Sequence, residues 1–180
     1  MLYIIPIFIF IPLILMGIMI IVPSIIGNRI PPSFTREKTQ ILNIAKDELY
    51  KLLTNYKNYP LWVKYLYQVE TEKVEKGKLK IMQTYKKRKI YQQLTEVRRI
   101  ENSEISIVKS EDEGMTLWTY ILEYYEDYKT KMTIKETMYI YHPYLRFMLK
   151  YILKDENEKS GFFKMIKKFI KKNNKDKSKK

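Results

Sequence analysis

The chain has 180 residues and a formal charge of +14, with no cysteine and a single histidine, His142. Without cysteine there is neither a disulfide nor a thiolate nucleophile, and one histidine leaves zinc without its usual ligands. We therefore expect no metal site and no cofactor. Residues 164–180 hold nine lysines against one acidic residue, so the excess positive charge is concentrated near the C-terminal end.

Residues 1–26 carry no charged side chain and are apolar almost throughout. As a helix, a segment of this length spans about 37 Å at ~1.5 Å per residue, more than the roughly 30 Å hydrocarbon core of a bilayer. We interpret it as a single-pass transmembrane anchor. A cleaved signal peptide is the alternative, but the segment lacks a basic start and a small-residue cleavage site. Arg29, Arg36 and Lys38 follow it, so the positive-inside rule places the following domain in the cytoplasm, at the cell membrane.

The remaining sequence divides into a linker (27–33), one domain of ordinary size (34–170) and a basic tail (171–180). The linker keeps the domain at the membrane surface, because seven extended residues reach only ~23 Å. The tail is either simply solvated or attracted to anionic lipid. Specific nucleic-acid binding is not indicated, because the basic residues are mostly lysines, which lack the planar fork of arginine.

The domain begins with an extended segment, 34–42, and a helix over 45–54 whose leucines recur at helical spacing. From residue 63 the pattern changes to strands that short turns separate, which indicates an antiparallel meander. Six strands are predicted, over 63–74, 79–86, 89–100, 104–110, 115–125 and 131–141. A long helix then begins at Pro143, a residue favoured in the first helical turn. It either continues through residue 170 or is interrupted at 157–161.

The last predicted hairpin decides which side chains share the inner face of the sheet. With a loop of even length, Tyr125 pairs with Thr130. One face then carries the facing pairs Leu117 and Met138, Thr119 and Glu136, and Ile121 and Ile134. The opposite face carries Trp118, Tyr120 and Tyr124. A slip of one residue would exchange the two faces of one strand relative to the other.

Four segments carry a family resemblance: Ile44–Trp62, Leu117–Tyr120, Thr130–Glu136 and His142–Arg146. They are similar to an opening helix that ends at a Pro-x-Trp, a closing hairpin and the start of a long helix. In this order they resemble the SRPBCC superfamily, the START-like or helix-grip proteins of polyketide cyclase/dehydrase and lipid-transport type. The chain departs from the family in lacking a Gly-Gly-Thr turn before the last strand.

This resemblance implies an α+β, helix-grip fold, in which an antiparallel seven-stranded curved sheet wraps around a long C-terminal helix; here one transmembrane helix precedes it. It also implies a cavity for a hydrophobic ligand between the sheet and the helix. With the register given above, the expected lining is Trp62, Met82, Leu117, Thr119, Ile121, Ile134, Glu136, Met138 and Met148.

The function expected from these features is non-enzymatic binding of a lipid or other hydrophobic small molecule at the membrane. One alternative is a cyclase/hydratase-type enzyme that uses Glu136 for acid–base chemistry, although Glu136 could equally be structural and pair with Arg146. The other alternative is a membrane-tethered protein-interaction domain that docks a partner on its aromatic face. A filled interior would exclude a carrier and an enzyme, whereas an open cavity with Glu136 beside a second polar group would favour the enzyme.

Overall fold

The computed structural model describes the backbone of residues 4–74, 78–86, 91–152 and 158–177, without the side chains of 4–11, 13, 91, 158–160 and 174–177. The chain divides into two compact units. The smaller unit combines residues 1–34, 112–114 and 139–155, and the larger unit combines 35–111, 115–138 and 156–180. Each unit is described by itself.

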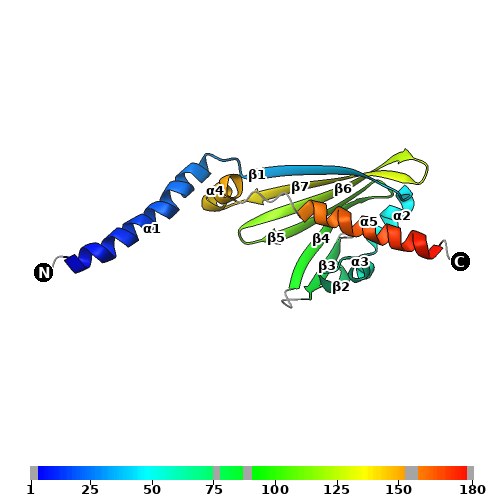
Figure 1. The fold of residues 1–180 in the computed structure, drawn as a ribbon, viewed down its shortest axis with the longest axis horizontal. Coiled ribbons are helices and arrows are strands. Elements are labelled where there is room, and N and C mark those ends of the chain that lie inside the picture. Colours follow the sequence, from blue (N-terminus) through cyan, green and yellow to red (C-terminus); the bar gives the residue numbers. More distant parts are fainter. Residues whose placement is uncertain (1–3, 75–77, 87–90, 153–157, 178–180) are drawn as a thin grey trace. The chain divides into compact units, whose positions relative to one another are not determined.

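The larger unit is built on one antiparallel sheet of seven strands (Figure 1). The strands are β1 (Ser33–Leu42), β2 (Leu66–Lys73), β3 (Leu79–Tyr85), β4 (Tyr91–Ile100), β5 (Glu104–Glu111), β6 (Gly114–Glu126) and β7 (Lys129–Ile140). Their spatial order is β1-β7-β6-β5-β4-β3-β2, so β2 to β7 form a meander and the first strand lies beside the last. A hydroxyl–hydroxyl hydrogen bond of 2.8 Å between Thr39 and Thr133 joins β1 to β7. The expected seven-stranded sheet is confirmed.

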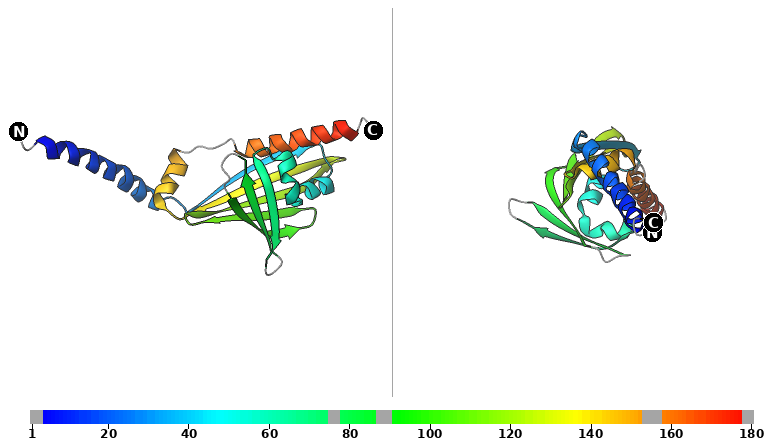
Figure 2. Two further views of the ribbon diagram at one scale, coloured as in Figure 1. Left: turned by 90° about the horizontal axis from the view of Figure 1, so that it is seen from below. Right: turned by 90° about the vertical axis from the view of Figure 1, so that its left-hand side faces the viewer.

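Short helical segments and one long helix lie against this sheet (Figure 2). The short ones are α2 (Lys46–Thr54), the 3-10 turn η1 (Tyr56–Asn58) and α3 (Tyr59–Trp62), and the long one is α5 (Glu158–Lys177). Phe163, Ile166 and Ile170 of α5 are buried in one core with Leu49 and Leu53 of α2. Burial of each such side chain stabilises the fold by about 1.5–3 kcal/mol. The apolar stripe of α5 therefore holds this helix against the sheet.

Of the two alternatives for the helix predicted from Pro143, one continuous and one interrupted, the structure agrees with the interrupted one. Two helices are present, α4 (Pro143–Tyr151) in the smaller unit and α5 in the larger unit. Residues 153–157 between them lie outside the described residues. The helix that the sheet grips is therefore α5. Because α5 runs on to Lys177, most of the expected basic tail (171–180) continues a helix, and its last three residues lie outside the described part.

The smaller unit consists mainly of α1 (Ile4–Asn28) packed against α4. The two backbones approach closely, because a Cβ added to Gly27 would lie 1.8 Å from the carbonyl oxygen of Pro143. Arg146 of α4 donates hydrogen bonds to the carbonyl oxygens of Ile140 (2.8 Å) and Tyr141 (2.9 Å). The expected pairing of Arg146 with Glu136 stays a prediction, because the two residues belong to different units.

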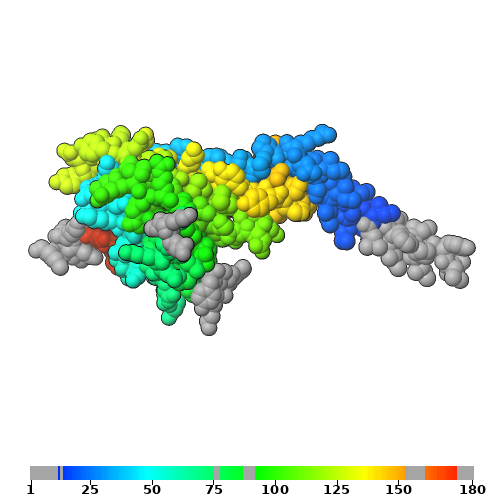
Figure 3. Space-filling model, turned by 180° about the vertical axis from the view of Figure 1, so that it is seen from behind, coloured from blue at the N-terminus to red at the C-terminus, as the bar shows by residue number. Residues whose placement is uncertain are grey.

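Helix α1 is apolar and largely uncovered in the part whose side chains are described (blue in Figure 3). Its large apolar side chains from Ile14 to Ile26 are 38–72% exposed. Within the described residues, no helix is both long enough and apolar enough to cross a membrane. The structure thus gives no support to the expected anchor over residues 1–26, of which residues 1–3 lie outside the described part.

Candidate ligand cavity

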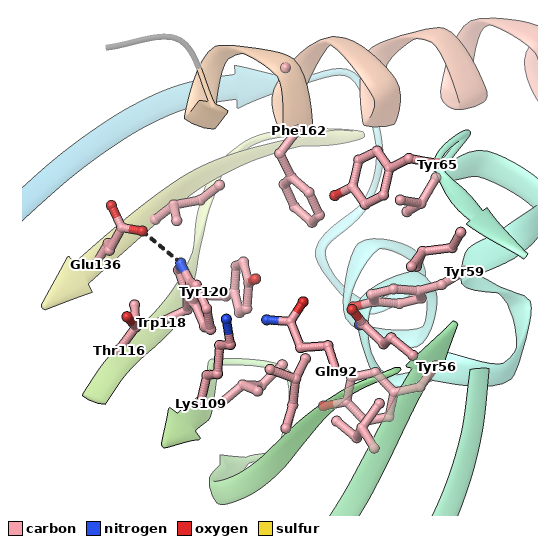
Figure 4. A pocket seen from close by; sticks show the side chains of 18 of the residues that line it. Tyr56, Tyr59, Tyr65, Gln92, Lys109, Thr116, Trp118, Tyr120, Glu136 and Phe162 are labelled. Atoms are coloured by element: carbon pink, nitrogen blue, oxygen red, sulfur yellow. Dashed lines mark hydrogen bonds between the residues drawn. The ribbon is translucent and has the colours of Figure 1, made fainter. Parts of the chain in front are cut away.

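A cavity opens between the concave face of the sheet, the segments η1 and α3, and the start of α5 (Figure 4). Its volume is about 710 Å³. Sites for drug-sized molecules typically enclose ~300–1,000 Å³, so this interior is neither sealed nor filled by side chains. The expectation of a cavity between the sheet and a C-terminal helix agrees with this geometry.

Every second residue of the inner strands reaches the cavity, as the pleat of a β-strand requires. Ile81, Gln83 and Tyr85 line it from β3, Ile107 and Lys109 from β5, and Ile134, Glu136 and Met138 from β7. Strand β6 contributes Thr116, Trp118 and Tyr120. The walls therefore combine apolar side chains with hydroxyl, amide and charged groups.

Strand β6 presents the face opposite to the predicted one. The indole Nε1 of Trp118 donates a hydrogen bond of 2.9 Å to Oε1 of Glu136, so these two residues share the inner face (Figure 4). The cause lies in the β6–β7 turn, where Tyr128 has a positive φ of 58°. A residue in the left-handed conformation directly after a turn is typical of a hairpin loop with a bulge and an odd number of residues. Compared with the even loop that was predicted, such a loop shifts the pairing of the two strands by one residue. The predicted register was wrong by this step.

The register explains which expected residues reach the cavity. Ile134, Glu136 and Met138 of β7 line it as expected. The residues expected from β6, namely Leu117, Thr119 and Ile121, alternate with the true lining residues and are not part of the wall. The face expected to dock a partner carries Trp118 and Tyr120, which instead point inward, and only Tyr124 of that face is exposed.

The other three expected residues lie elsewhere. Met82 sits between two inward-facing neighbours on β3 and so belongs to the outer face of the sheet. Trp62 is 5% exposed and belongs to the core beneath a second groove. Met148 lies on α4, in the smaller unit. None of the three lines the cavity.

The lining residue Tyr56 belongs to a polar cluster with the buried Glu96 and the exposed Arg99, which the sequence did not predict. The hydroxyl of Tyr56 donates to Oε2 of Glu96. Arg99 donates to both oxygens of the same carboxylate, from Nε at 2.7 Å and from a terminal nitrogen at 2.6 Å. Burial, and then the hydrogen bond to Glu96, raise the pKa of Tyr56. The Tyr56 side chain thus stays a neutral, oriented hydroxyl in the cavity wall.

Aromatic rings connect this part of the cavity wall to α5. The ring of Tyr59 lies 4.8 Å from that of Trp62, which lies 5.5 Å from Phe162. Phe162 points from α5 into the cavity and lies 5.8 Å from the ring of Tyr120 (Figure 4). Burial raises the pKa of both Tyr59 and Tyr120, so both hydroxyls stay protonated at neutral pH.

The strands that line the cavity contribute further polar groups. Tyr65 and Tyr85 stack with ring centres 5.7 Å apart, and the Tyr85 hydroxyl donates to Gln92. Lys109 projects from β5 and pairs with Glu111 at 2.5 Å. Figure 4 shows Glu136 and Trp118 at one end of the cavity and Tyr56 and Tyr59 at the other. An elongated ligand would therefore meet a carboxylate at one end and tyrosine rings at the other.

Comparison with known proteins assigns a fold and nothing finer. No family model and no curated protein matches this sequence. Among solved structures, a START superfamily protein from Mycobacterium smegmatis matches with a TM-score of 0.58 and 9% identity, over 77% of this chain and 97% of that one. Truncated norcoclaurine synthase from Thalictrum flavum matches with 0.59 and 8%, over 77% and 93%.

A third match is the di-domain aromatase/cyclase BexL from the BE-7585A biosynthetic pathway, with a TM-score of 0.51 and 9% identity. It covers 61% of this chain but only 37% of that protein, so this chain spans little more than a third of its length. At such identities the likeness shows the fold alone. The chain has the START-like, helix-grip fold of these proteins, as its sequence resemblance predicted.

Proposed function

We propose that the larger unit binds a hydrophobic small molecule in the cavity between its sheet and α5. The observation that carries the proposal is the open volume of about 710 Å³, lined by aromatic and aliphatic side chains together with several polar groups. Pockets of this kind hold small molecules, and their sparse polar groups fix the orientation of the ligand. The likeness to START superfamily and aromatase/cyclase structures supports the same kind of occupant.

The lining also narrows the chemical class. The wall includes the aromatic rings of Tyr56, Tyr59, Tyr120, Trp118 and Phe162. Aromatic rings favour stacked or edge-on contacts with other rings. The Tyr56 and Tyr59 hydroxyls donate their protons to Glu96 and to the carbonyl oxygen of Leu53, so towards a ligand these oxygens act as acceptors. We therefore favour an aromatic or polycyclic molecule with hydroxyl groups over a saturated acyl chain.

Mass spectrometry of the purified full chain tests this proposal. The protein is kept in its native state and then extracted with organic solvent, and the extract is compared with that of an unrelated protein purified in the same way. We expect a hydrophobic compound bound to a large fraction of the molecules. Absence of any such compound, together with failure to take up hydrophobic molecules from a cell extract, would contradict it.

A second candidate, dehydration of a β-hydroxy ketone, rests on Glu136. Its carboxylate lines an open cavity and accepts a hydrogen bond from Trp118, the arrangement that favours acid–base chemistry. Glu136 would take the proton from the carbon beside the carbonyl, the hydroxyl group would leave as a C=C bond forms, and the ammonium of Lys109 would protonate it to water.

This reaction can be followed with 4-hydroxy-4-phenylbutan-2-one, whose dehydration gives a conjugated ketone with strong ultraviolet absorbance. If Glu136 is catalytic, Glu136→Gln abolishes the reaction while binding of a neutral fluorescent probe persists. If the wild-type protein produces no conjugated ketone, this activity is not present and binding alone stands.

We also propose that residues 1–26 attach the chain to the cell membrane, with the larger unit on the cytoplasmic side. The proposal rests on the uncharged sequence and on the exposed apolar side chains of α1 from Ile14 onward. In alkaline extraction the full chain should stay with the membranes. A reporter fused after Lys180 should be active only on the cytoplasmic side. Release of the protein by alkali would contradict the attachment.

A further inference from the structure

A second hollow of the larger unit lies outside the cavity, between α3 and α5. Its volume is about 610 Å³. Its apolar lining comes from Leu61, Trp62, Met165 and Phe169. Its cationic lining comes from Lys64, Lys164, Lys168, Lys171 and Lys172, all of them exposed. No acidic side chain occurs among the described residues that line it. We call this surface the lysine groove.

The lysines of the groove are arranged by helical periodicity. Four of them lie on α5 at positions i, i+4, i+7 and i+8, which places them along one side of the helix. Met165 and Phe169 lie between them, half-buried, while Phe163 and Ile166 of the same helix are buried in the core. Helix α5 thus has a core face and, beside it, a face that mixes apolar and cationic side chains.

Leu61 is the most exposed apolar side chain of the groove. It is 75% exposed, whereas its neighbour Trp62 is 5% exposed. An isolated exposed leucine is ordinary, but this one is surrounded by lysines over an apolar floor. Apolar side chains that insert into a bilayer surface are typically surrounded by lysines in this way. The apolar group enters the boundary of the acyl chains, while the lysines stay among the headgroups.

We infer that the lysine groove docks on a bilayer surface rich in anionic lipid. Lysines act as hydrated point charges, which suits attraction to a field of negative headgroups better than bidentate recognition of one phosphate. Met165 lines both the groove and the ligand cavity, so a docked bilayer lies beside the cavity wall. The inference does not depend on what the cavity binds, nor on residues 1–26.

A single fluorescent label can report this docking, because the chain has no cysteine. The full chain with Leu61→Cys carries a polarity-sensitive NBD label and is reconstituted with vesicles of phosphatidylcholine, alone or with one-third phosphatidylglycerol. We expect brighter, blue-shifted emission only with the anionic vesicles, lost in about 1 M salt, where the Debye length falls to ~3 Å. A label at Lys135→Cys, on an exposed position of β7, should not respond.

Charge variants separate the groove from general basicity. Lys168→Gln with Lys172→Gln should lower the docked-to-undocked ratio about tenfold or more. Lys51→Gln with Lys135→Gln removes the same charge from exposed positions outside the groove and should leave that ratio unchanged. Three results overturn the inference: an equal response to neutral vesicles, an equal loss in the control pair, or a response to dispersed dodecyl phosphate but not to vesicles. The last would make the groove a site for single amphiphiles.

Discussion

Two arginine–glutamate pairs at the β4–β5 end of the sheet contrast a buried carboxylate with a partly buried one whose arginine is exposed. Glu96, 8% exposed, accepts two hydrogen bonds from Arg99 and one from Tyr56. Arg98 and Glu104 form a longer contact of 3.3 Å, with 62% and 21% of their side chains exposed. Buried charges that lose their partners are costly, whereas exposed pairs contribute ~0–1 kcal/mol.

We therefore expect Glu96→Gln to lower the free energy of unfolding by about 2 kcal/mol, because it weakens charge-assisted hydrogen bonds in a desolvated site. The matched change Glu104→Gln should cost less than about 1 kcal/mol. Denaturant unfolding of both variants measures the difference. Equal losses would show that burial of the Glu96 cluster has no special energetic role.

The buried tyrosines of the cavity predict a stability change at high pH. Burial raises the pKa of Tyr56 and of Tyr59 above the ordinary value of about 10. The folded state therefore holds these protons more tightly than the unfolded state, and the stabilisation is complete below pH ~10 and is lost as the pH rises above it.

Each of the two groups can lower the free energy of unfolding by up to about 1.4 kcal/mol per pH unit in that range. Unfolding measured against pH, for the wild type and for Tyr59→Phe, checks this. The variant should show a shallower decline above pH ~10. A decline of the same slope in both proteins would contradict the assignment of Tyr59.

At the scale of single elements, the β6–β7 hairpin holds a tyrosine in an unfavourable backbone conformation. Tyr128 has φ 58° and is 83% exposed, so it is strained but contributes little packing. A left-handed residue other than glycine costs roughly 1–2 kcal/mol, part of which glycine offsets through its greater freedom in the unfolded chain.

Tyr128→Gly should therefore stabilise the protein by about 0.5–1 kcal/mol without changing the register, as thermal unfolding would show. Asn102→Gly is a suitable comparison, because Asn102 also has a positive φ (52°) but asparagine tolerates it better, so its gain should be smaller. A loss of stability in Tyr128→Gly would mean that the tyrosine side chain itself holds the turn.

This hairpin also shows where sequence reasoning succeeded and where it failed. The strands were predictable because turn residues such as those at 101–103 and 111–114 separate β-branched and aromatic runs. The inward face of β6 was not predictable, because both faces of this strand are apolar. The turn gave no help either, because a tyrosine in the sequence does not indicate a residue with positive φ. The periodicity of the sequence shows that the side chains of a strand alternate between two faces. The register between two strands depends on the geometry of the turn that joins them.

The contact between Tyr56 and Glu96 could not be predicted from the sequence, for a different reason. Tyr56 and Glu96 are 40 residues apart in sequence, and neither belongs to a motif that would join them. Their contact exists only after η1 has folded against β4. By contrast, Ile134, Glu136 and Met138 were predictable, because the resemblance implied a cavity between the sheet and the helix and alternation places these three residues on one face of their strand.

The packing of α1 on α4 depends on one glycine. A Cβ at position 27 would lie 1.8 Å from the Pro143 carbonyl oxygen, whereas nothing lies within 4 Å of a Cβ at Gly17 of the same helix. Gly27→Ala should therefore separate the two helices and increase hydrogen–deuterium exchange of the α4 amides, at a cost of about 1–3 kcal/mol. Gly17→Ala should leave α4 exchange unchanged. Equal exchange in both variants would refute the close contact at Gly27.

At the scale of the whole molecule, the chain combines a helix-grip fold that contains a cavity with an apolar first helix and a lysine-rich last helix. The larger unit contains both the cavity and the lysine groove, and Met165 contributes to each. The basic residues 171–177, which were predicted to belong to a separate tail, are part of helix α5. The proposed attachment through residues 1–26 and the inferred docking of the lysine groove therefore rest on separate surfaces.

The central claim is that the cavity accepts a hydrophobic ligand, and a blocked cavity tests it most directly. The measurement is the affinity of the neutral fluorescent probe N-phenyl-1-naphthylamine for the wild type, Met138→Trp and Lys135→Trp. Met138 faces the cavity, whereas Lys135 is an exposed residue of the same strand. We expect one probe per chain, affinity at least tenfold weaker in Met138→Trp, and no change in Lys135→Trp. Equal affinities in all three folded proteins would contradict the account.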